Sequence, residues 1–128
     1  MLVRYPDSMT ARDAVSGFAA LSHPVRLALF RTLCEAAPER ISAGDLAHGF
    51  DVPPSTMTGH LQALERAGLI KAERRSRFML YSINPDGTRR LVRYLIEDCC
   101  QRRPELTDAE TDAGDTQADS HANLAHAF

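Results

Sequence analysis

The residues most suited to chemistry in this sequence are two adjacent cysteines, Cys99 and Cys100, within the segment EDCCQRRPELT at positions 97–107. Neighbouring cysteines can close a disulfide only through a small strained ring, so a structural cross-link is a poor explanation for the pair. Thiolates are soft ligands that favour soft metal and metalloid ions. We therefore interpret the pair as a thiol site that captures a soft ligand.

The remaining cysteine, Cys34, stands in the segment HPVRLALFRTLCEA at positions 23–36. Leu27, Phe30 and Cys34 fall at i, i+3 and i+7, which is the spacing of one helical face. Cys34 is therefore predicted to be a core residue rather than a ligand. Three cysteines are an odd number without framework spacing, which favours free thiols over a disulfide scaffold.

Other features of the sequence indicate a cytoplasmic protein that is not an enzyme. The N-terminal segment lacks the apolar run of a signal peptide, and no apolar stretch is long enough to span a bilayer. We therefore expect a cytoplasmic location, reduced thiols and no membrane partner. The sequence shows no CxxC pair, no phosphate-binding glycine loop and no acid–base constellation beside the thiols. No enzymatic activity and no obligatory cofactor are expected.

The charge distribution separates a basic body from an acidic tail. Residues 1–103 contain fifteen basic and eleven acidic side chains, whereas residues 104–128 contain six acidic side chains and no Lys or Arg. A chain of 128 residues with 44% hydrophobic content can bury one modest core. We predict one domain over 1–103, whose positive surface suits a polyanion, and a disordered tail over 104–128.

Hydrophobic spacing and cap residues predict a mainly α-helical fold with a small β-hairpin. Helices are expected over 11–22 and 23–36, with Pro24 at the first helical position of the second. A short helix capped by Ser42 is expected next, at 41–50.

The segment PSTMTGHLQALERA at 54–67 predicts an amphipathic helix whose polar face suits DNA. Met57, Leu61 and Leu64 form its apolar stripe, and Ala67-Gly68 stops it. The opposite face offers short hydrogen-bonding side chains and a glycine that permits close approach: Ser55, Thr56, Thr58, Gly59 and Gln62. Such residues can contact base edges in a major groove, and a helix N-terminus favours phosphate. His60, on the buried flank, is predicted to pack rather than to read bases.

Residues 69–83 predict a β-hairpin with a cationic tip. The apolar residues of its two arms, among them Ile70 and Phe78, follow a strand pattern. The tip carries Arg74, Arg75 and Arg77. Three arginines in four residues, beside a groove-sized helix, favour contact with phosphates over simple solubilisation of a turn.

The chain after the hairpin predicts a turn at 84–87 and a last helix over 88–103. Apolar residues cover more of this helix than one small domain needs, which indicates a helical dimer contact. Adjacent residues on a helix point about 100° apart, so Cys99 and Cys100 can hold one atom only if the last turn loosens or ends. The following Pro104 favours such an end.

Together, three segments resemble the ArsR/SmtB family of metal- and metalloid-responsive repressors: LSHPVRLALFRTLCEA, STMTGHLQALERAGLI and the hairpin ERRSRFMLYSI. The similarity covers roughly residues 14–100. It implies a winged helix-turn-helix that dimerises through its first and last helices and binds double-stranded operator DNA. In that family the helix matching 54–67 enters the major groove, and the dimer leaves its operator when an inducer binds.

The family holds its inducers at several places, and two of them lack ligands here. One arsenite-responsive type has cysteines on the helix before the recognition helix, where this chain has Ser42 and Gly44. A zinc-responsive type needs histidines on the final helix, and residues 86–103 contain none. Both sites are therefore predicted to be absent.

A third type has a cysteine pair near the end of the final helix, followed by Arg-Pro-Glu and another cysteine. Cys99-Cys100 and the Arg-Pro-Glu at 103–105 match that pattern, whereas Thr107 stands where the third cysteine is expected. The resemblance therefore implies that a trivalent arsenical, arsenite or methylarsenite, is the inducer. A redox-responsive repressor using the same thiols is the alternative, and a small thiol-dependent enzyme is a more distant one.

Overall fold

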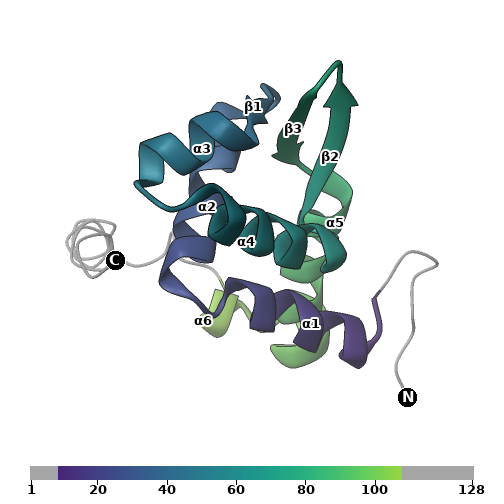
Figure 1. The fold of residues 1–128 in the computed structure, drawn as a ribbon. Helices are drawn as coiled ribbons and strands as arrows, with labels where there is room; N and C mark the ends of the chain where they lie inside the picture. The colour runs from purple at the N-terminus through teal and green to yellow at the C-terminus, as the bar shows by residue number, and fades with distance from the viewer. Residues whose placement is uncertain (1–8, 108–128) are drawn as a thin grey trace, which may run out of the picture. The chain divides into compact units, whose positions relative to one another are not determined.

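The structure, a computed structural model, describes residues 9–107 (Figure 1). These residues form helices and one small sheet. The chain forms two compact units that meet in sequence between Leu91 and Val92. In order, the first unit contains α1 (Ala11–Leu21), α2 (Pro24–Ala36), β1 (Ile41–Ser42), α3 (Ala43–Phe50), α4 (Pro54–Arg66), β2 (Ile70–Arg75), β3 (Phe78–Ile83) and most of α5 (Pro85–Arg93).

The helix starts follow from their cap residues. Thr10 accepts a hydrogen bond from the backbone N–H of Asp13 at the start of α1, and the ring of His23 accepts one from Val25 at the start of α2, both at 3.1 Å. Ser42 accepts from Asp45 at 3.1 Å in α3. These side chains satisfy N–H groups that have no partner within the helix. The predicted break before Pro24 and the predicted Ser42 cap are confirmed.

The core lies where α2, α4 and the sheet meet. Its fully buried side chains are Leu29, Leu33, Met57, Leu61, Leu64, Leu69 and Ile70. The predicted apolar stripe of α4 is therefore confirmed. The predicted stripe of α2 is wrong, because Leu29 and Leu33, four residues apart, form its buried face. Cys34 follows Leu33 by one residue, about 100° around the helix, and is exposed rather than in the core.

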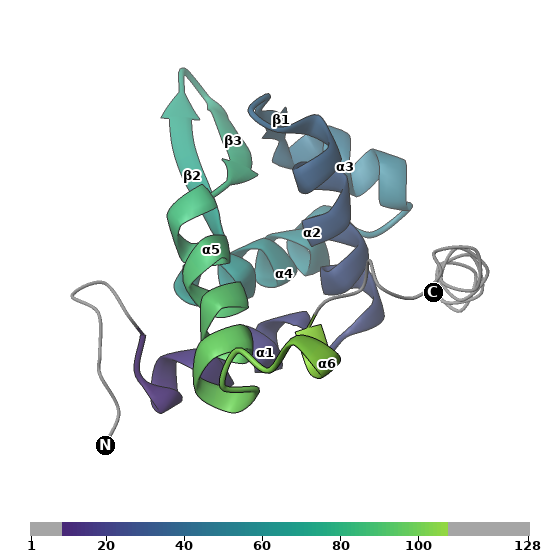
Figure 2. The ribbon, with the colours of Figure 1, turned by 180° about the vertical axis from the view of Figure 1, so that it is seen from behind.

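Small residues of α1 face the core, so that other helices approach it closely. Ala14, Gly17 and Ala20 are buried in this helix. A Cβ at position 17 would lie 3.1 Å from the methyl groups of Leu91 in α5, so glycine allows this contact. Figures 1 and 2 show α1 and the β-hairpin on opposite sides of α4.

The hairpin of β2 and β3 confirms the predicted wing. β1 adds to it, so that the described sheet has the antiparallel order β1-β3-β2, with Ile41 opposite Tyr81. The ladder of β2 and β3 ends at Arg75 opposite Phe78, and Ser76 in the connecting turn has a φ of 59°. β1 was not predicted because two residues are too few to show a strand period.

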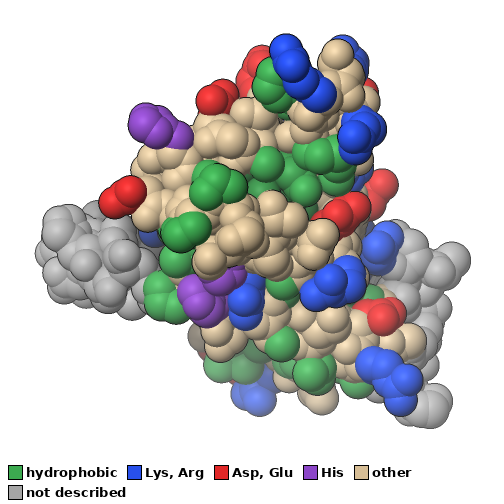
Figure 3. All heavy atoms as spheres, viewed as in Figure 1, with side chains coloured by type: hydrophobic (Ala, Val, Ile, Leu, Met, Phe, Trp, Pro, Cys, Tyr) green, Lys and Arg blue, Asp and Glu red, His purple; other side chains and the backbone are tan. Residues whose placement is uncertain are grey.

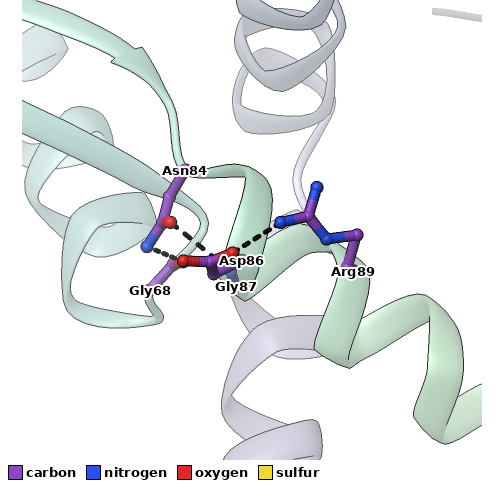
Figure 4. A network of polar contacts seen from close by, with 5 residues as sticks. All are labelled: Gly68, Asn84, Asp86, Gly87 and Arg89. Atoms are coloured by element: carbon purple, nitrogen blue, oxygen red, sulfur yellow. Dashed lines mark hydrogen bonds and ion pairs between the residues drawn. The ribbon is translucent and has the colours of Figure 1, made fainter.

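The chain leaves the sheet through a junction with the end of α4. Residues 85–87, predicted as part of a separate turn, are instead the first turn of α5. The side-chain amide of Asn84 donates to the carbonyl oxygen of Gly68 (3.0 Å), and the N–H of Gly87 donates to the side-chain oxygen of Asn84 (3.4 Å; Figure 4). Gly68, with a φ of 80°, ends α4 as predicted.

The second unit contains the rest of α5, a π-helix η1 (Tyr94–Cys99) and a short helix α6 (Pro104–Thr107). The predicted last helix over 88–103 therefore ends earlier, at Cys99. The tail predicted over 104–128 begins with α6, and its remainder, residues 108–128, lies outside the described residues. Across residues 9–107 no helix is both long and apolar enough to cross a membrane.

Candidate DNA-binding surface and thiol site

The polar face of α4 is open to a partner. The five residues of α4 that were predicted to contact DNA lie on this face and are exposed: Ser55, Thr56, Thr58, Gly59 and Gln62. A Cβ added at Gly59 would meet no atom within 4 Å, so nothing in the described chain covers this position. The hydroxyl of Thr58 donates to the carbonyl oxygen of Pro54 (3.0 Å), which fixes its direction. The face can therefore approach a groove closely.

The N-terminus of α4 carries no side-chain cap. Pro53 occupies the cap position and offers no hydrogen-bond acceptor to the first helical N–H groups. Uncapped N–H groups and the helix dipole both favour a negative group such as phosphate. This end of the helix therefore suits a phosphate group.

The three wing arginines are exposed but have different surroundings. Figure 3 shows basic side chains at the end of the hairpin that points away from α4. Arg75 donates from Nε to Glu73 Oε2 (2.9 Å), and Arg40 Nε lies 3.1 Å from Glu73 Oε1. The hydrogen bond from Arg75, aided by the charges of both arginines, lowers the pKa of Glu73. Part of the charge of Arg75 is thus compensated within the protein.

The other two wing arginines have no carboxylate partner within the described residues. Arg74 Nη1 lies 4.0 Å from the sulfur of Met79, and the guanidinium of Arg77 lies over the ring of Phe78, 5.9 Å from its centre. Phe78 was predicted only as an apolar residue of the hairpin, yet 54% of it is exposed. Its place at the tip, next to arginines, was the signal available in the sequence.

His60 packs against α2, as predicted. Its Nδ1 lies 3.5 Å from Arg26 Nη1, and its ring centre lies 4.6 Å from that of His23. Partial burial, followed by the proximity of His23 and Arg26, lowers the pKa of His60. These contacts place His60 between α4 and the start of α2.

The predicted thiol ligands lie where regular helical structure stops. Cys99 is the last residue of η1 and is exposed, and Cys100 is partly exposed. The N–H of Cys100 donates to the carbonyl oxygen of Leu95 (2.9 Å), five residues back, and Gln101 then has a φ of 55°. The α-helical turn that would hold the two side chains about 100° apart is not formed here. π-helical turns are rare and are found frequently at functional sites.

The arginines that follow the thiol pair are paired with carboxylates. Arg102 contacts Glu97 (2.5 Å), and Arg103 contacts Glu105 (2.7 Å). The hydroxyl of Thr107, in the position of the expected third cysteine, donates to the carbonyl oxygen of Arg103 (3.2 Å). The segment after the cysteines thus carries two ion pairs and one side-chain-to-backbone hydrogen bond.

The third cysteine, Cys34, belongs to α2. Partial burial of its thiol and then the charge of Glu35 raise the pKa of Cys34, which reduces its thiolate fraction at neutral pH. Over residues 9–107, no group of three or more His, Cys, Asp or Glu side chains is placed to hold a metal ion.

Comparison with known proteins identifies the family. Residues 21–73 match the family of helix-turn-helix domains. The biofilm growth-associated repressor of Agrobacterium fabrum (strain C58 / ATCC 33970) is 30% identical over 86 residues, which are 67% of this chain and 71% of that protein. A crystal structure of an ArsR family transcriptional regulator has a TM-score of 0.62 and 22% identity, over 83% of this chain and 99% of that one. The chain belongs to the ArsR family.

Two further structures show how this ArsR-family regulator compares with other solved proteins. A possible transcriptional regulator for arsenical resistance has a TM-score of 0.55 and 26% identity, over 60% of this chain and 77% of that one. A homodimeric winged helix-turn-helix DNA-binding domain from Mycobacterium bovis has a TM-score of 0.55 and 22% identity, over 72% and 85%. The chain is thus a transcriptional regulator with a winged helix-turn-helix fold.

Proposed function

We propose that this ArsR-family regulator is a repressor that binds operator DNA as a homodimer and leaves it when a trivalent arsenical binds Cys99 and Cys100. The observation that carries the proposal is the position of two accessible cysteines at the point where η1 ends. The similar regulator for arsenical resistance supports the choice of ligand.

The DNA-binding part of the proposal rests on α4 and the wing. α4 offers an open polar face and an uncapped N-terminus, which suit base edges and phosphates respectively. The exposed arginines Arg74, Arg75 and Arg77 stand on the wing and can neutralise further phosphates. In this proposal α4 enters the major groove.

The homodimer is supported by large apolar side chains that the single chain leaves exposed. Val15 in α1 is 65% exposed, Val92 in α5 is 50% exposed, and Leu95 in η1 is 43% exposed. Contact between two copies would remove such surface from water, which is favourable. These residues lie on the first and last helices, through which the chain was predicted to dimerise.

The coordination chemistry follows from two thiols rather than three. Methylarsenite has one bond from arsenic to carbon, so two thiols can replace its two hydroxyl groups. Each thiol proton leaves with one hydroxyl group as water. Inorganic arsenite offers three exchangeable positions and is held best by three thiolates. We therefore expect Cys99 and Cys100 to respond more strongly to methylarsenite than to arsenite, with Thr107 in place of a third thiol.

Binding at the thiol pair has a covalent route to the DNA-binding surface. α5 begins at the junction of Asn84 with Gly68, at the end of α4, and the same segment continues into η1 and the cysteines. Rearrangement of the helix end can therefore bias the position of α4. A coupling free energy of about 1–3 kcal/mol changes DNA affinity by about 5- to 150-fold.

The test is a titration of the complex between the full chain and DNA from upstream of its own gene. Methylarsenite, arsenite and an oxidant such as hydrogen peroxide are added separately, and the fraction of bound DNA is measured. The proposal expects release by the arsenicals at concentrations near that of the protein, with methylarsenite the more effective. Release by the oxidant alone would instead favour a redox-responsive repressor, and stronger release by arsenite would contradict the selectivity.

A further inference from the structure

A polar pocket of about 410 Å³ lies between the start of α1, the end of α4 and the first turns of α5, all within the first compact unit. Its volume is in the range of small-molecule sites, roughly 300–1,000 Å³. The polar side chains that line it are those of Asp13, Ser16, Arg66 and Arg90. None of these residues belongs to the polar face of α4, the wing or the thiol pair, so the pocket has no role in the proposed response to arsenicals.

Two arginines bring positive charges to the pocket that the protein does not compensate. Arg66 is exposed and Arg90 is partly buried. Within residues 9–107 neither guanidinium forms an ion pair or a side-chain hydrogen bond, whereas the neighbouring Arg89 is paired with Asp86. Guanidinium groups bind carboxylates through two parallel N–H···O hydrogen bonds. Arg66 and Arg90 therefore favour a ligand that carries carboxylate groups.

Other groups of the pocket favour a positive charge on the same ligand. Asp13 adds a carboxylate from α1. Ala67 and Gly68 line the pocket at the C-terminal end of α4, which is the negative end of the helix dipole. Two cations and one anion thus surround the pocket. A ligand with two carboxylates and one ammonium group matches each of these charges with its opposite.

Simpler ligands satisfy only part of this arrangement. Inorganic phosphate or sulfate would meet the arginines but would place negative oxygens near Asp13. A simple amine would leave both arginines without a partner. Among the lining residues that the structure describes, Met9 is the only large apolar one, so an aromatic ligand would find little apolar surface. A small acidic amino acid fits the charges, the polarity and the volume together.

We propose that this pocket is a second effector site, in which Arg66 and Arg90 hold the carboxylates of an acidic amino acid and Asp13 holds its ammonium group. Gly68, at the edge of the pocket, also accepts the hydrogen bond from Asn84 that joins α4 to α5 (Figure 4). A ligand that contacts α1, α4 and α5 stabilises the arrangement to which it binds. Its effect on DNA rests on the operator binding proposed above, whereas its binding to the pocket does not.

The first experiment measures binding without DNA. The isotope-labelled full chain is titrated with L-glutamate or L-aspartate at constant pH and ionic strength, and its backbone amide signals are followed by NMR. Two matched probes each lack one group of glutamate: glutarate has no ammonium group, and 4-aminobutyrate has one carboxylate fewer. We expect saturable shifts centred on Asp13, Gly68 and Arg90. Glutamate or aspartate should bind about three- to fivefold more tightly than either matched probe, as expected for one partly screened ion pair.

Variants of the lining residues assign the charges. Arg66→Gln and Arg90→Gln should each weaken the binding of the acidic amino acid about three- to fivefold, because a carboxylate loses its cation. Asp13→Asn should weaken the binding of the amino acid but not that of glutarate. Arg12→Gln, at an exposed position of α1 outside the pocket, is the matched control. Circular dichroism checks the fold, and the exposed positions of Arg66 and Asp13 still test the pocket if Arg90→Gln does not fold.

Three results would overturn the ligand assignment. They are the absence of saturable shifts at the pocket, equal binding of glutamate and its two matched probes, and binding by Arg66→Gln and Asp13→Asn that equals that of Arg12→Gln.

A second experiment tests the effector role. The affinity of the full chain for DNA from upstream of its gene is measured with and without a saturating concentration of the amino acid, and it should change by about fivefold or more. Unchanged affinity would overturn the effector role. Failure to bind any upstream DNA would instead overturn the proposed function, while binding in the NMR titration would stand.

Discussion

The side-chain amide of Asn84 donates a hydrogen bond to the carbonyl oxygen of Gly68, 3.0 Å away, and so joins the start of α5 to the end of α4, the proposed recognition helix. The same side chain accepts a hydrogen bond from the N–H of Gly87. The carbonyl oxygen of Gly68 lies so close to Gly87 that an added Cβ would come within 1.8 Å of it. The junction therefore depends on both an amide and a glycine.

Gly87→Ala should destabilise the protein strongly, because the methyl group would overlap backbone atoms that cannot move without separating α5 from α4. We expect a loss of about 3 kcal/mol or more in the free energy of unfolding, measured by urea denaturation. Gly59→Ala is the matched control, since its methyl group meets nothing within 4 Å and alanine favours a helix interior by up to about 1 kcal/mol. Similar stability of the two variants would contradict this account of the junction.

Asn84→Asp should also destabilise the fold, because a carboxylate cannot donate a hydrogen bond to the carbonyl oxygen of Gly68. An unsatisfied, partly buried carbonyl group costs about 1–3 kcal/mol, and the same denaturation measurement detects it. The control is Asp86→Asn, which changes an exposed residue in the first turn of α5. Unchanged stability of Asn84→Asp would show that solvent replaces the amide.

His60 should make stability depend on pH. Its pKa is lowered in the fold, so below about pH 6.5, the usual histidine value, the unfolded chain binds more protons than the folded one. The contribution of neutral His60 to the free energy of unfolding is therefore complete above that pH. It is lost as the pH falls towards the lowered pKa of His60 in the folded protein. His60→Gln should flatten the decline in the free energy of unfolding between about pH 7 and pH 5.

His23 and Arg26 face His60 from α2 and remain in this variant. The control is His48→Gln, at an exposed position of α3. If the free energy of unfolding declines as steeply in His60→Gln as in the parent, other groups cause the pH dependence.

Glu73→Gln should strengthen binding to DNA of any sequence. Removal of the carboxylate charge frees the charges of Arg75 and Arg40, which lie 2.9 and 3.1 Å from its oxygens. Each new phosphate contact steepens the dependence of log K on log salt by about 0.9. Arg75→Ala should have the opposite effect, and Arg77→Ala should also reduce the slope. If none of these substitutions alters the dependence of log K on log salt, the wing does not contact the DNA.

Thr107→Cys should move the response from methylarsenite towards arsenite, because a third thiol then becomes available after Cys99 and Cys100. The ratio of the two concentrations that release half of the DNA measures the preference. Thr107→Ser removes only a methyl group and keeps a hydroxyl that can bond to Arg103. An unchanged ratio in Thr107→Cys would mean that position 107 does not reach the arsenic bound by the pair.

The sequence was sufficient to predict elements whose signals are local. The caps at Ser42 and Gly68 and the stripe of Met57, Leu61 and Leu64 each depend on neighbours within one or two helical turns. The hairpin was predictable for the same reason, because its two strands are joined by a short turn. These residues fix the position of α4 and the wing, which are the main parts of the proposed DNA-binding surface.

Other features depend on distant contacts and could not be predicted in this way. Which face of α2 is buried is decided by α4 and the sheet, and this choice places Cys34 outside the core. The change from α- to π-helical hydrogen bonds before Cys99 has no clear sequence signature.

The most direct test of the account follows DNA release in variants that lack single thiols. Fluorescence anisotropy of labelled operator DNA is measured while methylarsenite is added to the parent, Cys99→Ser, Cys100→Ser and Cys34→Ser. The account predicts equal DNA affinity for all four proteins, release in the parent and Cys34→Ser, and no release in the other two. Release in Cys99→Ser and Cys100→Ser at the same concentration as in the parent, or loss of the response in Cys34→Ser, would contradict it.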